Sequence, residues 1–334
     1  LPGKAPLDED GFLVSFDVDG NENEQQEMQK FLEKFGFVCV RNVLTEKQTD
    51  ASMNEFFSKF DKNDPKSIEA FYDKQQFKSM GLIGLVSDID SIRQMENRQN
   101  PKVYKAYSRV LQKKELIVDI GRMGALRPTV DLESGKVKKE WKTLDQWLHL
   151  DCHPITGRVA VASFGNAHLP HDFDKQWLPQ GFLTLTDARE QDGGFHCVPG
   201  SHKIVKEWAK RYHNESRGSS IQVPKDDALR NHVQNIPLRK GCLFVWSAFV
   251  IHGNRPNHSE RYRAVQYIRM FPVGLNFQPL WPKKEFPQSV KYSALGRRLF
   301  GFCKWTPSFD PFDVDAVDNE PDSDNTSNNN DDNE

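Results

Sequence analysis

The chain has 334 residues, of which 37% are hydrophobic and 23 are phenylalanine, so it can bury a large aromatic-rich core. Its formal net charge of −2 becomes +7 when the nine acidic residues of 313–334 are set aside, and no Lys/Arg run with interleaved aromatic residues predicts nucleic-acid binding. The longest apolar run is far shorter than the roughly 18 residues of a membrane span, and five cysteines without a CxxC pair favour a reduced protein, so we expect an intracellular, cytoplasmic location.

The first third of the chain has helical patterns. In the segment 24–35 the apolar residues Met28, Phe31, Leu32 and Phe35 recur with helical spacing, and Gly36 follows as a C-terminal cap. The apolar run 37–40 then predicts a short strand, and the sequence TEKQ at 45–48 has the pattern of a capping box that opens a second helix. A polar, helical character continues to about residue 115.

From residue 116 onward the pattern changes to short apolar or alternating runs separated by Gly, Pro, Asn and Asp. These runs are 116–126, 143–151, 157–164, 181–187, 243–252 and 261–271. Many short strands with turn signals between them predict a mainly β sandwich or barrel with flanking helices.

We expect one domain over residues 1–312, followed by a disordered acidic, Asn-rich tail at 313–334. Within that domain, 24–115 forms a helical support, 116–272 the β core and 273–312 a C-terminal extension.

The segment WLHLDCHP at 147–154 combines residues that bind metals. Side chains alternate between the two faces of a strand, so Trp147, His149 and Asp151 share one face. The same parity places His153 on that face if the strand continues so far, whereas Pro154 makes a bend equally plausible. Trp147 either lines a cavity or fills the barrel. A His-x-Asp triplet is common by chance, so a metal site requires a third ligand.

His252 is the best candidate for that third ligand. It ends the hydrophobic run 243–252, where burial of an imidazole costs free energy unless the ring is bound. Two histidines and one carboxylate on one face of an iron ion leave positions open for a chelating cosubstrate and dioxygen. His149, Asp151 and His252 are therefore the predicted metal ligands and catalytic residues.

Arg263 is the predicted cosubstrate residue. If 2-oxoglutarate chelates the iron, its far carboxylate requires a buried cation, for which a planar guanidinium is well suited. Arg263 lies eleven residues after His252, on the strand expected to return beside it. Arg261 shares its face and is the nearest rival.

Several segments resemble the phytanoyl-CoA dioxygenase (PhyH) family of Fe(II)/2-oxoglutarate-dependent oxygenases. The matching pieces are FLEKFGFVCVRNVLT near the start, HLD at 149, GFLTLTDAREQDGGFHCVPGSHK at 181–203, and GCLFVWSAFVIHGN with RYRA near the end. The resemblance implies a double-stranded β-helix, a cupin-like jelly roll, with iron at His149, Asp151 and His252 and 2-oxoglutarate at Arg263.

The activity implied is oxidation of an unactivated C–H bond of a small molecule, by hydroxylation, desaturation or cyclisation, with conversion of 2-oxoglutarate and dioxygen to succinate and CO2. Phe182 stands where many relatives have Trp. Because Asp151 is retained where halogenating relatives have a small residue, halogenation is disfavoured.

The substrate is expected to be a small molecule. Its wall candidates are Trp147, His153, Phe182 and Arg122, and Arg127 and Arg158 also lie near strand ends. The arginines near strand ends either recognise a carboxylate on the substrate or are ordinary surface residues. We expect a monomer or weak homodimer that spans no membrane and binds no nucleic acid. Two alternatives stay open: a zinc hydrolase on the same three ligands, which has no use for Arg263, and a non-catalytic jelly-roll binding module.

Overall fold

The computed structural model describes residues 1–83, 91–130, 135–145, 147–161, 165–168, 178–212, 220–274 and 289–312. The acidic tail at 313–334 lies outside these residues, as does part of the expected C-terminal extension. Among the described residues no helix is long and apolar enough to cross a membrane.

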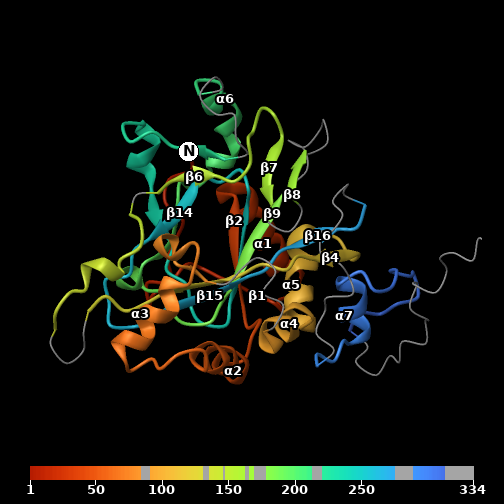
Figure 1. The fold of residues 1–334 in the computed structure, drawn as a ribbon. Coiled ribbons are helices and arrows are strands. Elements are labelled where there is room, and N and C mark those ends of the chain that lie inside the picture. Colours follow the sequence, from red (N-terminus) through yellow and green to blue (C-terminus); the bar gives the residue numbers. More distant parts are fainter. Residues whose placement is uncertain are drawn as a thin grey trace, which may run out of the picture.

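Two open sheets form the centre of the molecule (Figure 1). The larger has seven strands in the order β1 (Phe16–Asp17), β2 (Phe37–Arg41), β13 (Leu243–Ser247), β9 (Pro179–Thr184), β15 (Arg263–Tyr267), β5 (Met123–Leu126) and β3 (Leu82–Ile83). The smaller has five, in the order β11 (Ile221–Gln222), β6 (His149–Leu150), β14 (His252–Arg255), β10 (Gly194–Cys197) and β12 (Gln234–Asn235). Among the described residues there are also two separate strand pairs: β16 (Met270–Pro272) with β4 (Leu116–Val118), and β7 (Arg158–Val161) with β8 (Gly165–His168).

Helices surround these sheets. They are α1 (Glu22–Phe35), α2 (Glu46–Phe57), α3 (Pro65–Asp73), α4 (Ile92–Arg98), α5 (Pro101–Leu111), α6 (Val205–Ala209) and α7 (Ala294–Leu299). Short 3-10 turns occupy Lys78–Met80, Lys139–Trp141, Glu190–Asp192, Ser201–Lys203 and Ala228–His232. In Figure 1, α2 to α5 lie around the lower part of the view and α6 lies at the top.

The N-terminal predictions are confirmed, and this region also contributes to the large sheet. Helix α1 buries its four predicted apolar residues, and Gly36 caps it in the left-handed conformation. Thr45 and Gln48 form the reciprocal capping box of α2. Strand β2 is hydrogen-bonded to β13 in antiparallel register, so the segment expected to be a helical support also supplies part of the β structure.

Aromatic rings fill the space between the two sheets. Phe182 of β9 and Phe244 and Trp246 of β13 come from the large sheet, and Phe195 of β10 comes from the small one. The ring of Phe195 lies 4.8 Å from that of Phe244 and 4.9 Å from that of Trp246, between centroids. These contacts fix the two sheets face to face, because aromatic rings bury large apolar areas and prefer such tilted arrangements.

The run 243–252 is not one strand, and this corrects the predicted position of Arg263. Strand β13 ends at Ser247, whose carbonyl oxygen accepts the Val250 N–H in a turn, and His252 begins β14 in the other sheet. Strand β15 pairs with β5 and β9 rather than with β14. Arg263 therefore lies on the sheet that faces His252, not on a strand beside it.

Candidate metal centre

Two strands of the small sheet bring the predicted ligands together. His149 of β6 and His252 of β14 are register partners in an antiparallel pair, and Asp151 follows β6 on the same face as His149. Leu148 and Leu150 point the other way, into a second apolar core cluster. One ligand atom from each of His149, Asp151 and His252 lies within 4.8 Å of the others. The alternation predicted from the sequence thus produces a three-residue cluster.

The electrostatics of the cluster suit a cation. His149 Nε2 lies 3.1 Å from Asp151 Oδ1, and His252 Nε2 lies 3.5 Å from Asp151 Oδ2. Burial lowers the pKa of His149, which favours the neutral imidazole. Burial also opposes ionisation of Asp151, but the two imidazoles beside it hold the pKa of this carboxyl well below its usual range. A neutral imidazole at His149 and an ionised carboxylate at Asp151 are the protonation states that a metal ion requires of these two ligands.

The ring orientation of His252 tests whether the cluster fits a bound metal ion. Its Nδ1 lies 2.9 Å from the carbonyl oxygen of Val250, and a carbonyl can only accept a hydrogen bond. In the neutral ring Nδ1 therefore carries the proton, and the Nε2 lone pair faces the Asp151 carboxylate. Two acceptor atoms that face each other without a proton between them fit a bound cation, and a backbone partner for the second nitrogen is typical of metal-binding histidines.

Gln180 of β9 holds Asp151, the carboxylate ligand candidate, in place. Its Nε2 donates to Asp151 Oδ2 at 2.6 Å, and its Oε1 is buried without a hydrogen-bond partner among the described residues. This contact joins the large sheet to the ligand cluster of the small one. Gln180 was not among the predicted site residues, because nothing in the local sequence indicates which residue of β9 faces Asp151.

Aromatic rings pack on both histidines. The Trp147 ring stacks on His149 with 4.2 Å between centroids, and the Phe195 ring stacks on His252 at 5.5 Å. Trp246 meets His252 edge to face at 5.4 Å. These contacts limit the rotation of the imidazoles and keep water from one side of the cluster.

The three ligand candidates form part of the wall of a cavity of about 400 Å³. This volume lies within the range of small-molecule sites. Most of the wall is apolar or aromatic. The lining residues are Phe77, Met80, Leu82, Gly121, Arg122, Trp147, His149, Asp151, Gln180, Gly181, Phe195, Trp246, His252, Gly253, Asn254, Tyr267 and Arg269.

Arg263 points from β15 toward the small sheet. Its side chain is 1% exposed and its guanidinium lies over the Phe182 ring at 5.2 Å. A Cβ added to Gly194 of β10 would lie 2.9 Å from its Nε, so only glycine leaves room for this arginine. The Tyr267 hydroxyl oxygen accepts a hydrogen bond from the guanidinium, while Nε and Nη2 have no partner among the described residues. Burial lowers the pKa of Arg263. A buried guanidinium with two unused donors is suited to a carboxylate.

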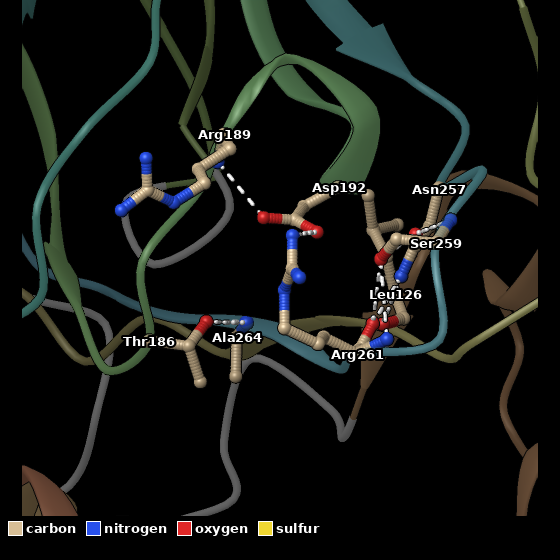
Figure 2. Close-up of polar contacts among 8 residues, drawn as sticks. All are labelled: Leu126, Thr186, Arg189, Asp192, Asn257, Ser259, Arg261 and Ala264. Atoms are coloured by element: carbon tan, nitrogen blue, oxygen red, sulfur yellow. Dashed lines mark hydrogen bonds and ion pairs between the residues drawn. The ribbon is translucent and has the colours of Figure 1, made fainter. Parts of the chain in front are cut away.

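Arg261 occupies a different environment (Figure 2). The Arg261 side chain is 59% exposed, and its Nη2 lies 2.8 Å from Oδ1 of the buried Asp192. The other carboxylate oxygen of Asp192, Oδ2, accepts the Arg189 N–H. Asn257 Nδ2 donates to the Arg261 carbonyl, and Thr186 Oγ1 accepts the Ala264 N–H. Arg261 and these neighbours fix the segment that leads into β15.

The predicted wall residues divide into two groups. Trp147 and Arg122 line the cavity. Phe182 lies between the sheets beneath Arg263 and is not part of that wall. His153 is also absent from it, because β6 ends at Leu150 and the His153 Nδ1 accepts the N–H groups of Ile155 and Thr156 in a turn. The wall residues Trp246, Asn254 and Tyr267 were not predicted.

A family model described as phytanoyl-CoA dioxygenase (PhyH) matches residues 32–265, well over half of the chain. A Dictyostelium discoideum protein that bears this family's name is 28% identical over 309 residues, which cover 81% of this chain and 86% of the relative.

Two solved structures have a similar fold. The epimerase SnoN, in complex with Fe3+, alpha-ketoglutarate and nogalamycin RO, is 11% identical and covers 78% of this chain and 89% of its own, with a TM-score of 0.53. The non-haem alpha-ketoglutarate-dependent carbocyclase SnoK is 14% identical and covers 80% of this chain and 90% of its own, with a TM-score of 0.50. At these identities the likeness concerns the fold alone, and the predicted jelly-roll class is confirmed.

Proposed function

Because this chain belongs to the phytanoyl-CoA dioxygenase family of non-haem iron, 2-oxoglutarate-dependent oxygenases, we propose that it hydroxylates an unactivated C–H bond of a small molecule. The observation that carries the proposal is the cluster of His149, Asp151 and His252 on the wall of the apolar cavity. When bound there, iron supplies the means to activate dioxygen while 2-oxoglutarate is converted to succinate and CO2. Desaturation and ring closure are the other outcomes of the same oxidation.

The protein's own contribution to the metal site is orientation. His149 and His252 come from paired strands, so their separation is set by the sheet rather than by a loop. The Val250 carbonyl sets the tautomer of His252, and Gln180 holds Asp151. We assign these three ligands to iron because two imidazoles and one carboxylate, with the remaining positions open, are typical of non-haem iron oxygenases.

Arg263 is the proposed partner of the far carboxylate of 2-oxoglutarate. It is the most deeply buried of the three arginines at 261, 263 and 269, and it projects between the sheets toward the small sheet that holds the metal ligands. Arg269 is already paired with the buried Asp119 and Arg261 with Asp192. Of these three arginines, Arg263 is the one with buried guanidinium donors that have no hydrogen-bond partner among the described residues.

Anaerobic titration of the full chain with Fe(II) and then 2-oxoglutarate tests the proposal. A weak visible charge-transfer band that requires both additions is the expected result, because it arises only when the cosubstrate chelates the metal. Metal binding without any response to 2-oxoglutarate contradicts the proposal and favours a hydrolytic site. Succinate release under air, screened against amino-acid derivatives, acyl-CoAs and terpenoids, then identifies the substrate class.

A further inference from the structure

The β core has three arginines near strand ends: Arg122, Arg127 and Arg158. The structure describes the side chains of Arg122 and Arg127, and these two lie in different environments. The Arg127 guanidinium lies between aromatic rings, 4.5 Å from the Tyr72 centroid and 4.7 Å from that of Trp141, and takes no part in the cavity wall. Arg122, at the other end of the same strand, lines the cavity that holds the metal-ligand candidates. The side chain of Arg158 lies outside the described residues.

Arg122 has no carboxylate partner among the described residues. Its guanidinium lies 4.8 Å from the centroid of Phe77, and its Nη1 is buried without a hydrogen bond. Burial lowers the pKa of Arg122, and the nearby Arg269 adds to this effect. Tyr267 opposes it in part, and no Asp or Glu side chain of the described residues forms an ion pair with Arg122. A desolvated guanidinium with an unused donor is costly for the folded protein unless an anion binds it.

Hydrogen bonds from Arg98 and Tyr267 fix the backbone around Arg122. The buried Arg98 donates to the carbonyl oxygens of Asp119 and Gly121, at 3.1 and 2.7 Å, and the Arg122 carbonyl accepts the Tyr267 N–H at 2.9 Å. These hydrogen bonds fix the start of β5, from which the Arg122 side chain extends over Phe77. Its position is therefore set before any ligand arrives, which reduces the entropic cost of binding.

The other charges of the cavity wall have assigned partners. Arg269 donates from Nε to Asp119 Oδ2 at 2.7 Å, and Asp151 is a ligand of the proposed metal site, where a metal ion would balance its charge. Arg263, proposed for 2-oxoglutarate, is not part of this wall. Arg122 is thus the cation of the described wall that lacks a counterion.

The surroundings of Arg122 are apolar. Phe77, Met80 and Leu82 line its end of the cavity, and Trp147 and Trp246 line the part next to the metal ligands. A ligand that fills this space must bury apolar surface along most of its length, since polar groups without partners are penalised there. One cation in apolar surroundings matches one negative charge on an apolar body.

We propose that Arg122 binds the carboxylate of an amphipathic monocarboxylic acid, whose apolar body lies along the aromatic wall toward His149 and His252. Binding of the carboxylate at Arg122 does not depend on the proposed oxygenase function. Oxidation of the end of the apolar body that lies near His149 and His252 does rest on that function. A single guanidinium matches the charge and planar geometry of a carboxylate. A phosphate dianion requires a second unpaired cation, and Arg269, the other arginine of the described wall, is already paired with Asp119.

The test measures binding of acids and of their neutral amides to the full chain loaded with Mn(II) and saturated with 2-oxoglutarate. The probes are phenylacetate, phenylbutyrate and octanoate with the corresponding amides. The signal is calorimetric heat together with the tryptophan fluorescence of the chain, to which Trp147 and Trp246 in the cavity wall contribute. Bound 2-oxoglutarate occupies the metal and Arg263, so that the acids report on the remaining cavity. The variants are Arg122→Gln, Arg122→Lys and the matched control Arg127→Gln, each checked for folding by thermal unfolding.

We expect at least one acid to bind about tenfold or more tightly than its amide. This preference should disappear in Arg122→Gln, persist in part in Arg122→Lys and remain complete in Arg127→Gln. The proposal is overturned if no acid exceeds its amide, if the preference survives Arg122→Gln, or if Arg122→Gln weakens 2-oxoglutarate binding tenfold, which makes Arg122 a cosubstrate residue. If wild type binds no 2-oxoglutarate, the proposed function fails, whereas the acid-to-amide comparison on the metal-free chain still decides the role of Arg122.

Discussion

Replacing Arg263 by methionine removes the buried guanidinium of β15 and keeps a long, flexible side chain in its place. The wild-type guanidinium is 1% exposed and has two donors without partners among the described residues. Desolvation of an unpaired charge costs several kcal/mol, of which the Tyr267 hydrogen bond offsets a part. In the absence of 2-oxoglutarate we therefore expect Arg263→Met to unfold at the same temperature as wild type or at a higher one.

Binding of 2-oxoglutarate should change in the opposite direction. Loss of one partner of a buried charged pair costs about 2–5 kcal/mol, which corresponds to a rise of about 30-fold to several-thousand-fold in the Kd or apparent KM for 2-oxoglutarate. The affinity for iron should change little. At a concentration near 100 times Kd, the cosubstrate adds about 2.7 kcal/mol to the stability of wild type, and this increment should vanish in the variant.

Thermal unfolding with and without 2-oxoglutarate, together with succinate release, measures both effects. Arg261→Met is the matched comparison: its guanidinium is largely exposed and paired with Asp192, so we expect less than about a tenfold change in KM. A larger loss of 2-oxoglutarate affinity in Arg261→Met than in Arg263→Met transfers the cosubstrate role to Arg261. A strongly destabilised Arg263→Met without a change in KM leaves Arg263 a purely structural residue.

Alanine at each of the three proposed metal ligands should abolish turnover and weaken iron binding without unfolding the chain, and full activity in any one variant excludes that residue from the site. Gln180→Leu removes the amide that holds Asp151, so iron affinity should fall by about 10- to 100-fold in a metal titration, and an unchanged affinity removes its positioning role. Gly194→Ala places a methyl group against Arg263, so the KM for 2-oxoglutarate should rise. Because Gly194 has a φ of +102°, alanine there also strains the backbone. Gly274→Ala controls for this strain, since Gly274 has a φ of +93° and open space around it, and it should leave KM unchanged.

Local patterns predicted the parts of the fold that depend on neighbouring residues. The helical spacing in 24–35 and the capping box at Thr45 depend on hydrogen bonds within a few residues, and both are found where expected. The face shared by His149 and Asp151 follows from strand geometry alone. For the same reason the ligand cluster could be predicted in outline.

Long-range pairing could not be predicted in this way. The turn after Ser247 moves His252 into the small sheet, although the sequence from 243 to 251 is continuously apolar apart from that serine. Which strand lies beside β15 depends on sheet order, which no local periodicity encodes. For this reason Gln180 was missed, and the sequence left open whether His153 shares the strand face or lies in a bend at Pro154. Each position depends on where a strand ends or which strand lies opposite.

The pairing of β6 with β14 also has a consequence for the life of the protein in a cell. His149 and His252 are about a hundred residues apart in the chain and become neighbours only when the sheet closes, so the unfolded chain offers iron no comparable site. The free energy of metal binding is then added almost entirely to the native state. We expect the iron-free protein to unfold and be degraded faster than the loaded one, so that iron supply sets its abundance as well as its activity.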